Sequence, residues 1–240
     1  MARETLAQVS SNLEVTSIQG EIFISAKDIS CLYKKGNNSV VALNAVSCQL
    51  HSGDRIAVVG PSGSGKSTLL QVMGGIEPPT SGTITWPALG PRHALRPEKI
   101  GFIFQTESLL EPLNCIENVK IPLLLSHVGE EEADEAAFNA LKKLSLENLA
   151  NKLPEELSGG QAQRVAAARA IVRQPKVILA DEPTGQLDQT TGQHLLDLLL
   201  ASIEGTDTAL VIATHDMTVA RRMKTVWYME HGRLEVRQHC

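Results

Sequence analysis

Short apolar runs alternate with helical patterns along most of the chain. Arg55–Val59, Val177–Ala180 and Ala209–Ala213 are apolar runs of the length and composition typical of buried parallel strands. Ser67–Met73 and Thr190–Ile203 follow helical spacing instead, and leucines in the second range line one face. This alternation predicts an α/β fold with a parallel sheet at its centre.

The chain also contains patterns that predict antiparallel strands. Ile22–Tyr33 and Val41–Leu50 are β segments separated by the turn-rich Gly36-Asn37-Asn38. Near the other end, residues 226–236 predict a closing hairpin around His231-Gly232. We therefore expect an antiparallel β portion beside the parallel core.

The middle of the chain becomes helical after a further short strand, Ile100–Phe104. An acidic run, residues 130–135, begins one helix, and Ser158–Arg173 predicts another that Pro175 ends. We expect an inserted helical lobe at about residues 106–174, within one domain of residues 21–240. Residues 1–20 are polar and mixed, and predict a loose tail.

Composition narrows the class of protein. Of 240 residues, 42% are apolar and 20% charged, as in ordinary globular domains, and the net charge of −5 offers no bulk attraction for nucleic acid or anionic lipid. No apolar run approaches the roughly 20 residues that span a bilayer, and no secretory signal is evident. Cys31, Cys48, Cys115 and Cys240 lack metal-ligand spacing, so buried thiols in a reducing cytoplasm are expected.

A glycine-rich motif links the strand at residues 55–59 to the next helix. We call Gly60-Pro61-Ser62-Gly63-Ser64-Gly65-Lys66-Ser67 the first glycine motif. Its backbone N–H groups and the helix N-terminus predict a cradle for nucleotide phosphates. Lys66 is placed to reach the terminal phosphates, the Ser67 hydroxyl to bind Mg²⁺, and Thr68 to add a phosphate contact.

Asp181-Glu182 stands where an apolar strand ends. In a protein with a phosphate loop, Asp181 is expected near the metal ion, beside Ser67, and Glu182 is expected to orient a water as general base. The alternative is a strand that ends in a solvated acidic turn.

Leu157-Ser158-Gly159-Gly160-Gln161, here the second glycine motif, predicts another anion site. Ser158 and Gln161 fit a capping box, and the glycines leave the first-turn amides bare. Glycine is unfavourable in a helix, so the pair indicates close approach by a ligand; an ordinary capped helix is the alternative. One nucleotide does not need two phosphate-binding ends, so two copies of the chain are expected to close on shared ATP.

Four further residues are candidates on weaker signals. Gln105 follows a strand, and its amide is able to bind Mg²⁺ or water. His215 also follows a strand and is placed to contact a γ-phosphate or to hold Glu182. Tyr33 is either an adenine-stacking ring or a core tyrosine. Asp188 lies in a loop after the carboxylates and is able to act across a dimer contact.

Together these motifs resemble the ATP-binding subunit of an ABC transporter over about residues 22–236. The resemblance implies a RecA-like P-loop NTPase core with an antiparallel β subdomain and an inserted α-helical subdomain. It implies that Gln105, Glu182 and His215 serve hydrolysis, that Asp188 belongs to the D-loop, and that two subunits pack head to tail around ATP and Mg²⁺. Transmembrane permease subunits are the implied partners, which would hold the chain at the inner face of the cell membrane.

Residues 73–82, 116–124 and 179–188 resemble the lipoprotein-release and macrolide-efflux branch of that family. A soluble ATPase of the same superfamily, acting on nucleic acid or ribosomes, is the alternative. Such proteins often carry a long coiled-coil insertion or two fused ATPase halves, whereas this chain has one set of motifs and a compact predicted lobe. The second glycine motif also argues against a P-loop kinase or GTPase.

Overall fold

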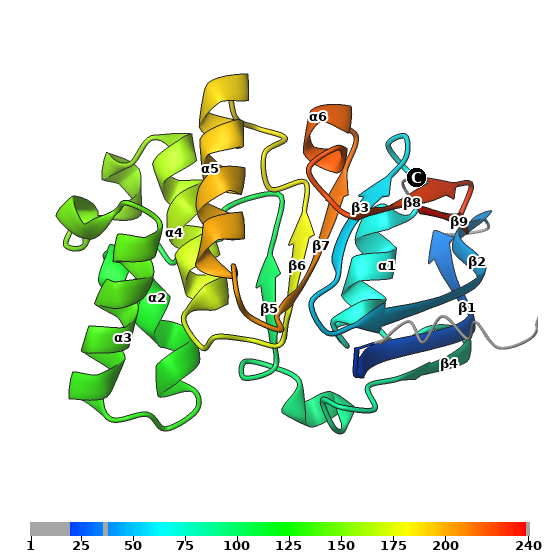
Figure 1. Ribbon diagram of the computed structural model, residues 1–240, viewed down its shortest axis with the longest axis horizontal. Helices are drawn as coiled ribbons and strands as arrows, with labels where there is room; N and C mark the ends of the chain where they lie inside the picture. Colours follow the sequence, from blue (N-terminus) through cyan, green and yellow to red (C-terminus); the bar gives the residue numbers. More distant parts are fainter. Residues whose placement is uncertain (1–19, 36–37, 239–240) are drawn as a thin grey trace, which may run out of the picture.

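The computed structural model describes residues 20–35 and 38–238 and contains two sheets (Figure 1). A six-stranded sheet has the order β5-β6-β7-β3-β8-β9, and a three-stranded sheet has the order β2-β1-β4. The strands of the larger sheet are β3 (Arg55–Val59), β5 (Ile100–Ile103), β6 (Val177–Asp181), β7 (Ala209–Thr214), β8 (Thr225–Glu230) and β9 (Arg233–Gln238). Those of the smaller sheet are β1 (Ile22–Lys35), β2 (Asn38–His51) and β4 (Ser81–Thr85).

The predicted parallel core is confirmed. Strands β5, β6, β7, β3 and β8 pair in parallel, with Ile178 opposite Leu210 and Ala57 opposite Ile212 in the register. Both faces of β3, β6 and β7 are buried, and alternate residues enter two hydrophobic clusters, Ile178 one and Leu179 the other. Burial on both sides explains why these strands are continuous apolar runs.

The antiparallel portions are also present. β1 pairs with β2, and β8 pairs with β9 as the predicted hairpin. Of the predicted turn at residues 36–38, Gly36 and Asn37 lie outside the described residues, as does the predicted tail up to residue 19. The sequence did not predict β4, which pairs with β1; its side chains are exposed or half-buried, so no apolar pattern marks it.

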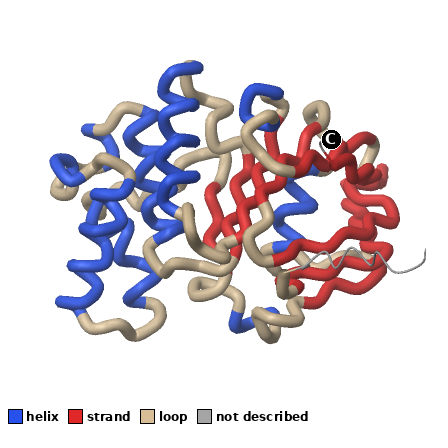
Figure 2. The backbone as a smooth tube through the Cα atoms, viewed as in Figure 1, coloured by secondary structure: helices blue, strands red, loops and turns tan. Residues whose placement is uncertain are grey.

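Helices lie between the two sheets and beside the large sheet (Figure 2). α1 lies between the two sheets and contacts β6 and β7 on one side and β1 and β2 on the other. α2, α3 and α4 pack on one another at the left of Figure 1, and α5 contacts α4. The bounds are α1 (Lys66–Met73), α2 (Cys115–Leu124), α3 (Glu130–Lys143), α4 (Gly159–Ile171), α5 (Gln189–Ser202) and α6 (Met217–Ala220).

The proline-containing connection between β4 and β5 packs against the end of α1. The Trp86 indole N–H donates to the Met73 carbonyl at 2.8 Å, and Arg92 donates to the carbonyls of Gly75 and Ile76. A short 3₁₀ helix, η1 (Arg92–Ala94), lies in this connection; η2 (Glu147–Leu149) and η3 (Pro154–Glu156) precede α4. The connection between β4 and β5 therefore packs directly over the end of α1.

The strand order decides where the motifs meet. β5, β6, β7 and β3 are adjacent and parallel, so their carboxyl ends lie along one edge of the sheet. Gln105 lies two residues after β5, and the residues that directly follow β6, β7 and β3 are Glu182, His215 and Gly60. Groups that are far apart in the sequence are therefore brought to one place, as is usual for binding sites of open α/β sheets.

Candidate functional site

A cavity of about 370 Å³ lies at this edge of the large sheet. Most of the predicted phosphate and catalytic residues line it. The lining residues are Tyr33, Val40, Ala42, Ser62, Gly63, Gly65, Lys66, Ser67, Thr68, Gln105, Glu182 and His215. The structure thus joins the first glycine motif, Gln105, Glu182 and His215 in one site.

The first glycine motif turns sharply into α1. Gly65 is the N-cap residue with φ of 104°, and a Cβ there would collide with the carbonyl oxygen of Ala42. Only glycine meets both conditions at this position. Lys66, 6% exposed, donates from Nζ to the carbonyls of Gly60 at 2.9 Å and Pro61 at 3.1 Å. Its ammonium therefore points into the loop that is predicted to hold the phosphates.

Asp181 ends β6 as a buried carboxylate, 7% exposed. The pKa of the Asp181 carboxyl is raised, mainly by burial and further by the charge of Glu182. A hydrogen bond from Ser67 and the charge of Lys66 act in the opposite direction. Its Oδ1 is buried without a hydrogen-bond partner. A buried carboxylate oxygen left open beside a serine hydroxyl is suited to a Mg²⁺ ion and its water shell, so these residues fit the predicted metal.

Glu182 is held between two partners. Its Oε2 lies 2.8 Å from Nδ1 of His215, and its Oε1 lies 3.6 Å from Nζ of Lys66. The residue has φ of 47°, in the left-handed region, and such strain in a non-glycine residue is common at functional sites. The arrangement can orient a water toward a phosphate, with His215 fixing the carboxylate. A solvated acidic turn, the alternative, does not fit a side chain that is only 12% exposed.

Tyr33 lies at the rim of the cavity and is 37% exposed, so it is not a core tyrosine. Its hydroxyl donates to Oε2 of Glu77 at 2.5 Å. Burial first, and then the bond to Glu77, raise the pKa of the phenol. Glu77 was not among the residues predicted from sequence; its bond fixes the hydroxyl end of the ring.

The second glycine motif forms the predicted capping box. The Gln161 amide N–H donates to Ser158 Oγ at 3.3 Å, and the Ser158 N–H donates to Gln161 Oε1 at 2.9 Å. Gly160 also has a close neighbour within the chain. A Cβ there would collide with the Thr191 methyl of α5, so close packing within the chain requires this glycine. Gly159 is exposed, and a Cβ there would have only Glu107 Oε1 within 4 Å, at 3.8 Å.

The second glycine motif does not line the 370 Å³ cavity, and Asp188 does not either. Asp188 is the N-cap of α5: its Oδ1 accepts from the Thr191 N–H at 3.0 Å and its Oδ2 from the Thr191 hydroxyl at 2.6 Å. These bonds lower its pKa. It lines a neighbouring hollow of about 500 Å³ together with Glu182 and His215.

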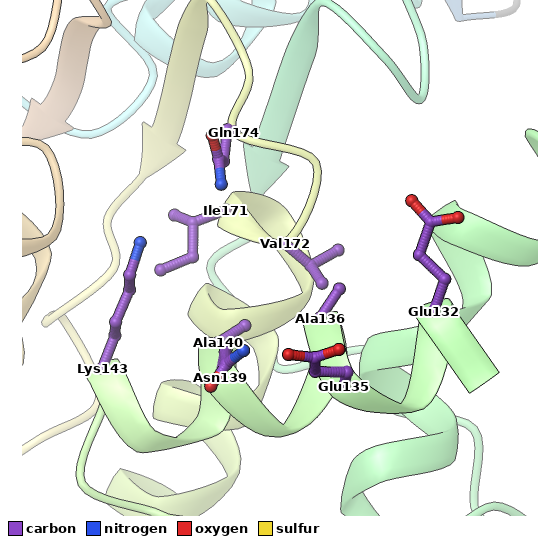
Figure 3. Close-up of a pocket in the computed structure, with 9 residues that line it drawn as sticks. All are labelled: Glu132, Glu135, Ala136, Asn139, Ala140, Lys143, Ile171, Val172 and Gln174. Carbon is purple, nitrogen blue, oxygen red and sulfur yellow. The ribbon is translucent and has the colours of Figure 1, made fainter. Parts of the chain in front are cut away.

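Another hollow, of about 230 Å³, lies between α3 and the end of α4 (Figure 3). Glu132, Glu135 and Lys143 come from α3, and Gln174 follows α4. None of the predicted site residues lines it.

Gln163 of α4 was not among the residues predicted from sequence. It is a buried polar residue among buried alanines, and a polar residue on the apolar face of a helix is the signal that would have indicated it.

Across residues 20–35 and 38–238, no helix combines the length and apolar character that a membrane crossing requires. The model of the ABC transporter family matches residues 43–185. The lipoprotein-releasing system ATP-binding protein LolD of Legionella pneumophila strain Paris is 43% identical over 91% of this chain and 99% of its own length. The protein of that name from Pseudomonas fluorescens is 41% identical over 88% of this chain and 96% of its own.

Solved structures agree with these sequence matches. A dimeric ATP-binding cassette in a post-hydrolysis state, bound to ADP and inorganic phosphate, has a TM-score of 0.81 and 36% identity over 90% of this chain and 98% of that one. A Clostridium perfringens protein, part of an ABC transporter complex, has a TM-score of 0.78 and 30% identity over 91% of this chain and 88% of that one.

Proposed function

Because the chain belongs to the ABC transporter family, as an ATP-binding subunit that couples ATP hydrolysis to transport, we propose that it hydrolyses ATP at sites shared by two copies. Each site would combine the first glycine motif of one copy with the second glycine motif of the other. The comparisons give no support to a function on nucleic acid or ribosomes.

One observation carries the proposal of shared sites. The cavity gathers the ends of β3, β5, β6 and β7, but the second glycine motif lies outside it. The motif nevertheless begins α4 with an exposed Gly159, and the N-terminus of a helix is a common anion site. In a dimer, the α4 helix end of one copy would complete the phosphate site in the cavity of the other copy. The dimeric structures of similar cassettes favour this arrangement.

The residues of the cavity divide the work. Backbone N–H groups of the first glycine motif and the Lys66 ammonium bind the phosphates, Thr68 adds a contact, and Tyr33 stacks on the adenine. Glu182, held by His215, accepts the proton of the attacking water. Asp188 orders the loop after the carboxylates at the dimer contact.

Ser67, Asp181 and Gln105 are proposed to hold a Mg²⁺ ion. The unpaired Asp181 Oδ1, its neighbour Ser67 and the cavity-lining Gln105 amide supply oxygen atoms of the kind this ion prefers. When bound, the ion would neutralise charge on the phosphates.

A groove beside β5 is the proposed contact for permease subunits. It has a volume of about 340 Å³ and lies between β5, α2 and α4. Phe102, Phe104, Leu110 and Ile121 make it apolar, and Arg169 adds positive charge. Such a surface suits a short apolar helix with an acidic end.

The proposed role of the chain in the cell follows from this contact. Bound to membrane subunits, it would be peripheral at the inner face of the membrane, as the resemblance implies. The similarity to LolD proteins favours a permease of the lipoprotein-release branch. We also propose that residues 21–240 act as one ATPase domain, in which α2, α3 and α4 belong to a helical lobe at about residues 106–174.

Lys66→Ala is expected to weaken ATP binding by about 10- to 100-fold, because it removes a charged hydrogen-bond donor worth about 1.5–3 kcal/mol. Equilibrium binding of a fluorescent ATP analogue measures the change. Lys176→Ala, at the opposite end of β6, is the matched control and should bind as the parent does. ATP affinity equal to the parent's in Lys66→Ala would contradict the role of the ammonium.

Leu110→Glu is expected to abolish association with the permease, because a carboxylate would be buried in the apolar groove. Leu110 is 51% exposed, so the isolated chain should fold and hydrolyse ATP as before. Co-purification from detergent-solubilised membranes measures the association and identifies the permease. Leu125→Glu, 67% exposed at the end of α2 and outside the groove, is the control. Equal recovery of membrane partners with both variants would argue against this docking surface.

A further inference from the structure

The segment of residues 104–110, here the Gln105 segment, is attached to the helical lobe by side-chain hydrogen bonds. Arg169 of α4 donates to the carbonyls of Ser108 at 3.0 Å and Glu107 at 3.2 Å. Asn118 of α2, fully buried, accepts from the Leu110 N–H at 2.8 Å and donates to the Leu110 carbonyl at 3.1 Å. These bonds hold the far part of the segment.

Gln163 of α4 holds the near part, where β5 ends. Its Nε2 donates to the Phe104 carbonyl at 3.1 Å, one residue before Gln105. Gln163 is 3% exposed, and the following helix residues Val165 and Ala166 are buried apolar side chains. A buried amide is costly unless it is hydrogen-bonded, so the bond fixes both the Gln163 side chain and the Phe104 carbonyl.

We propose that Gln163 is a positioning residue for Gln105. Its bond to Phe104 sets the point at which the chain leaves β5 and so directs the Gln105 amide into the phosphate cavity. Gln163 also lies two residues after the second glycine motif on the same helix. The helix α4 thus presents an anion site to the partner copy. Through Gln163 it also positions the Gln105 amide in the phosphate cavity of its own copy.

This link gives the two sites a physical connection. A shift of α4 caused by a partner's phosphate would reach Phe104 through the Gln163 bond and Ser108 through the Arg169 bond. A contiguous hydrogen-bonded path of this kind is able to couple neighbouring sites. The inference rests on the proposed role of Gln105 as a ligand of Mg²⁺.

The test is a double-mutant cycle of Gln163→Met and Gln105→Ala in the full chain. Methionine is close to glutamine in size but lacks the N–H donor. The measurement is the affinity for a fluorescent ATP analogue with and without Mg²⁺. The ratio of these two affinities reports the contribution of the metal ion to binding and does not depend on hydrolysis. We expect each single variant to reduce that ratio by about three- to tenfold, and the double variant to match Gln105→Ala alone.

Controls separate positioning from a general structural role. Binding without Mg²⁺ should stay at the parental value, because the first glycine motif is untouched. Gln174→Met makes the same change just after α4, where the side chain lines the hollow of Figure 3, and should leave the ratio unchanged. If Gln163→Met does not fold, Gln163→Leu tests the same bond, because leucine also lacks the N–H donor and is favourable in a helix.

The outcomes are distinct. Additive effects of the two substitutions, or equal loss of binding without Mg²⁺, would overturn the inference. The inference on Gln163 would also be overturned if Gln105→Ala lowers the ratio and Gln163→Met does not. The proposed role of Gln105 would stand in that case. If Gln105→Ala itself leaves the ratio unchanged, both the metal assignment of Gln105 and the positioning role of Gln163 fall.

Discussion

Glu182→Gln is expected to reduce ATP turnover by about 100- to 10,000-fold, the usual contribution of a general base. The amide has the size of the carboxylate and fits between Lys66 and His215, but it cannot take the proton of the attacking water. ATP binding should persist, because the first glycine motif is unchanged. The variant should accumulate as a closed dimer in the presence of ATP and Mg²⁺.

Phosphate release and size-exclusion chromatography with and without ATP measure these two effects. Glu98→Gln is the control, because Glu98 pairs with Arg173 at 3.3 Å near the beginning of β5, at the opposite edge of the sheet. It should retain turnover and show no ATP-dependent dimer beyond the parent's. Undiminished turnover in Glu182→Gln would refute the assignment of Glu182 as the base.

Ser158→Arg is expected to abolish hydrolysis while each monomer still binds ATP. A long cationic side chain at the tip of α4 would fill the space in front of Gly159, where the partner's phosphate is proposed to lie. ATP binding to the monomer should be unaffected, because Ser158 is outside the cavity. Hydrolysis and analogue binding, measured on the same preparation, separate the two effects.

The substitution also removes a helix cap, so a matched variant is needed. Ser158→Ala loses the same hydrogen bond from the Gln161 N–H, at a cost of about 1 kcal/mol in stability, but leaves the tip open. It should keep most of the hydrolytic activity. Normal turnover in Ser158→Arg would rule out sites shared between two copies.

Most elements were predictable because strongly patterned segments decide their own structure. The apolar runs at β3, β6 and β7 are buried on both faces, and the capping residues of α4 form the expected bonds. β4 was missed because its side chains are exposed or half-buried. The packing of Gly160 could not be predicted, because its close neighbour, Thr191, is distant in the sequence.

By itself, the sequence determined the local chemistry of this protein: the glycine turns, the carboxylates at a strand end and the helix caps, all set by neighbouring residues. Only the tertiary structure decided which of these groups meet. The order β5-β6-β7-β3 places His215 against Glu182 and leaves the second glycine motif outside their cavity. Sheet order and helix packing arise from contacts between distant segments, and the same is true of the bond from Gln163 to Phe104.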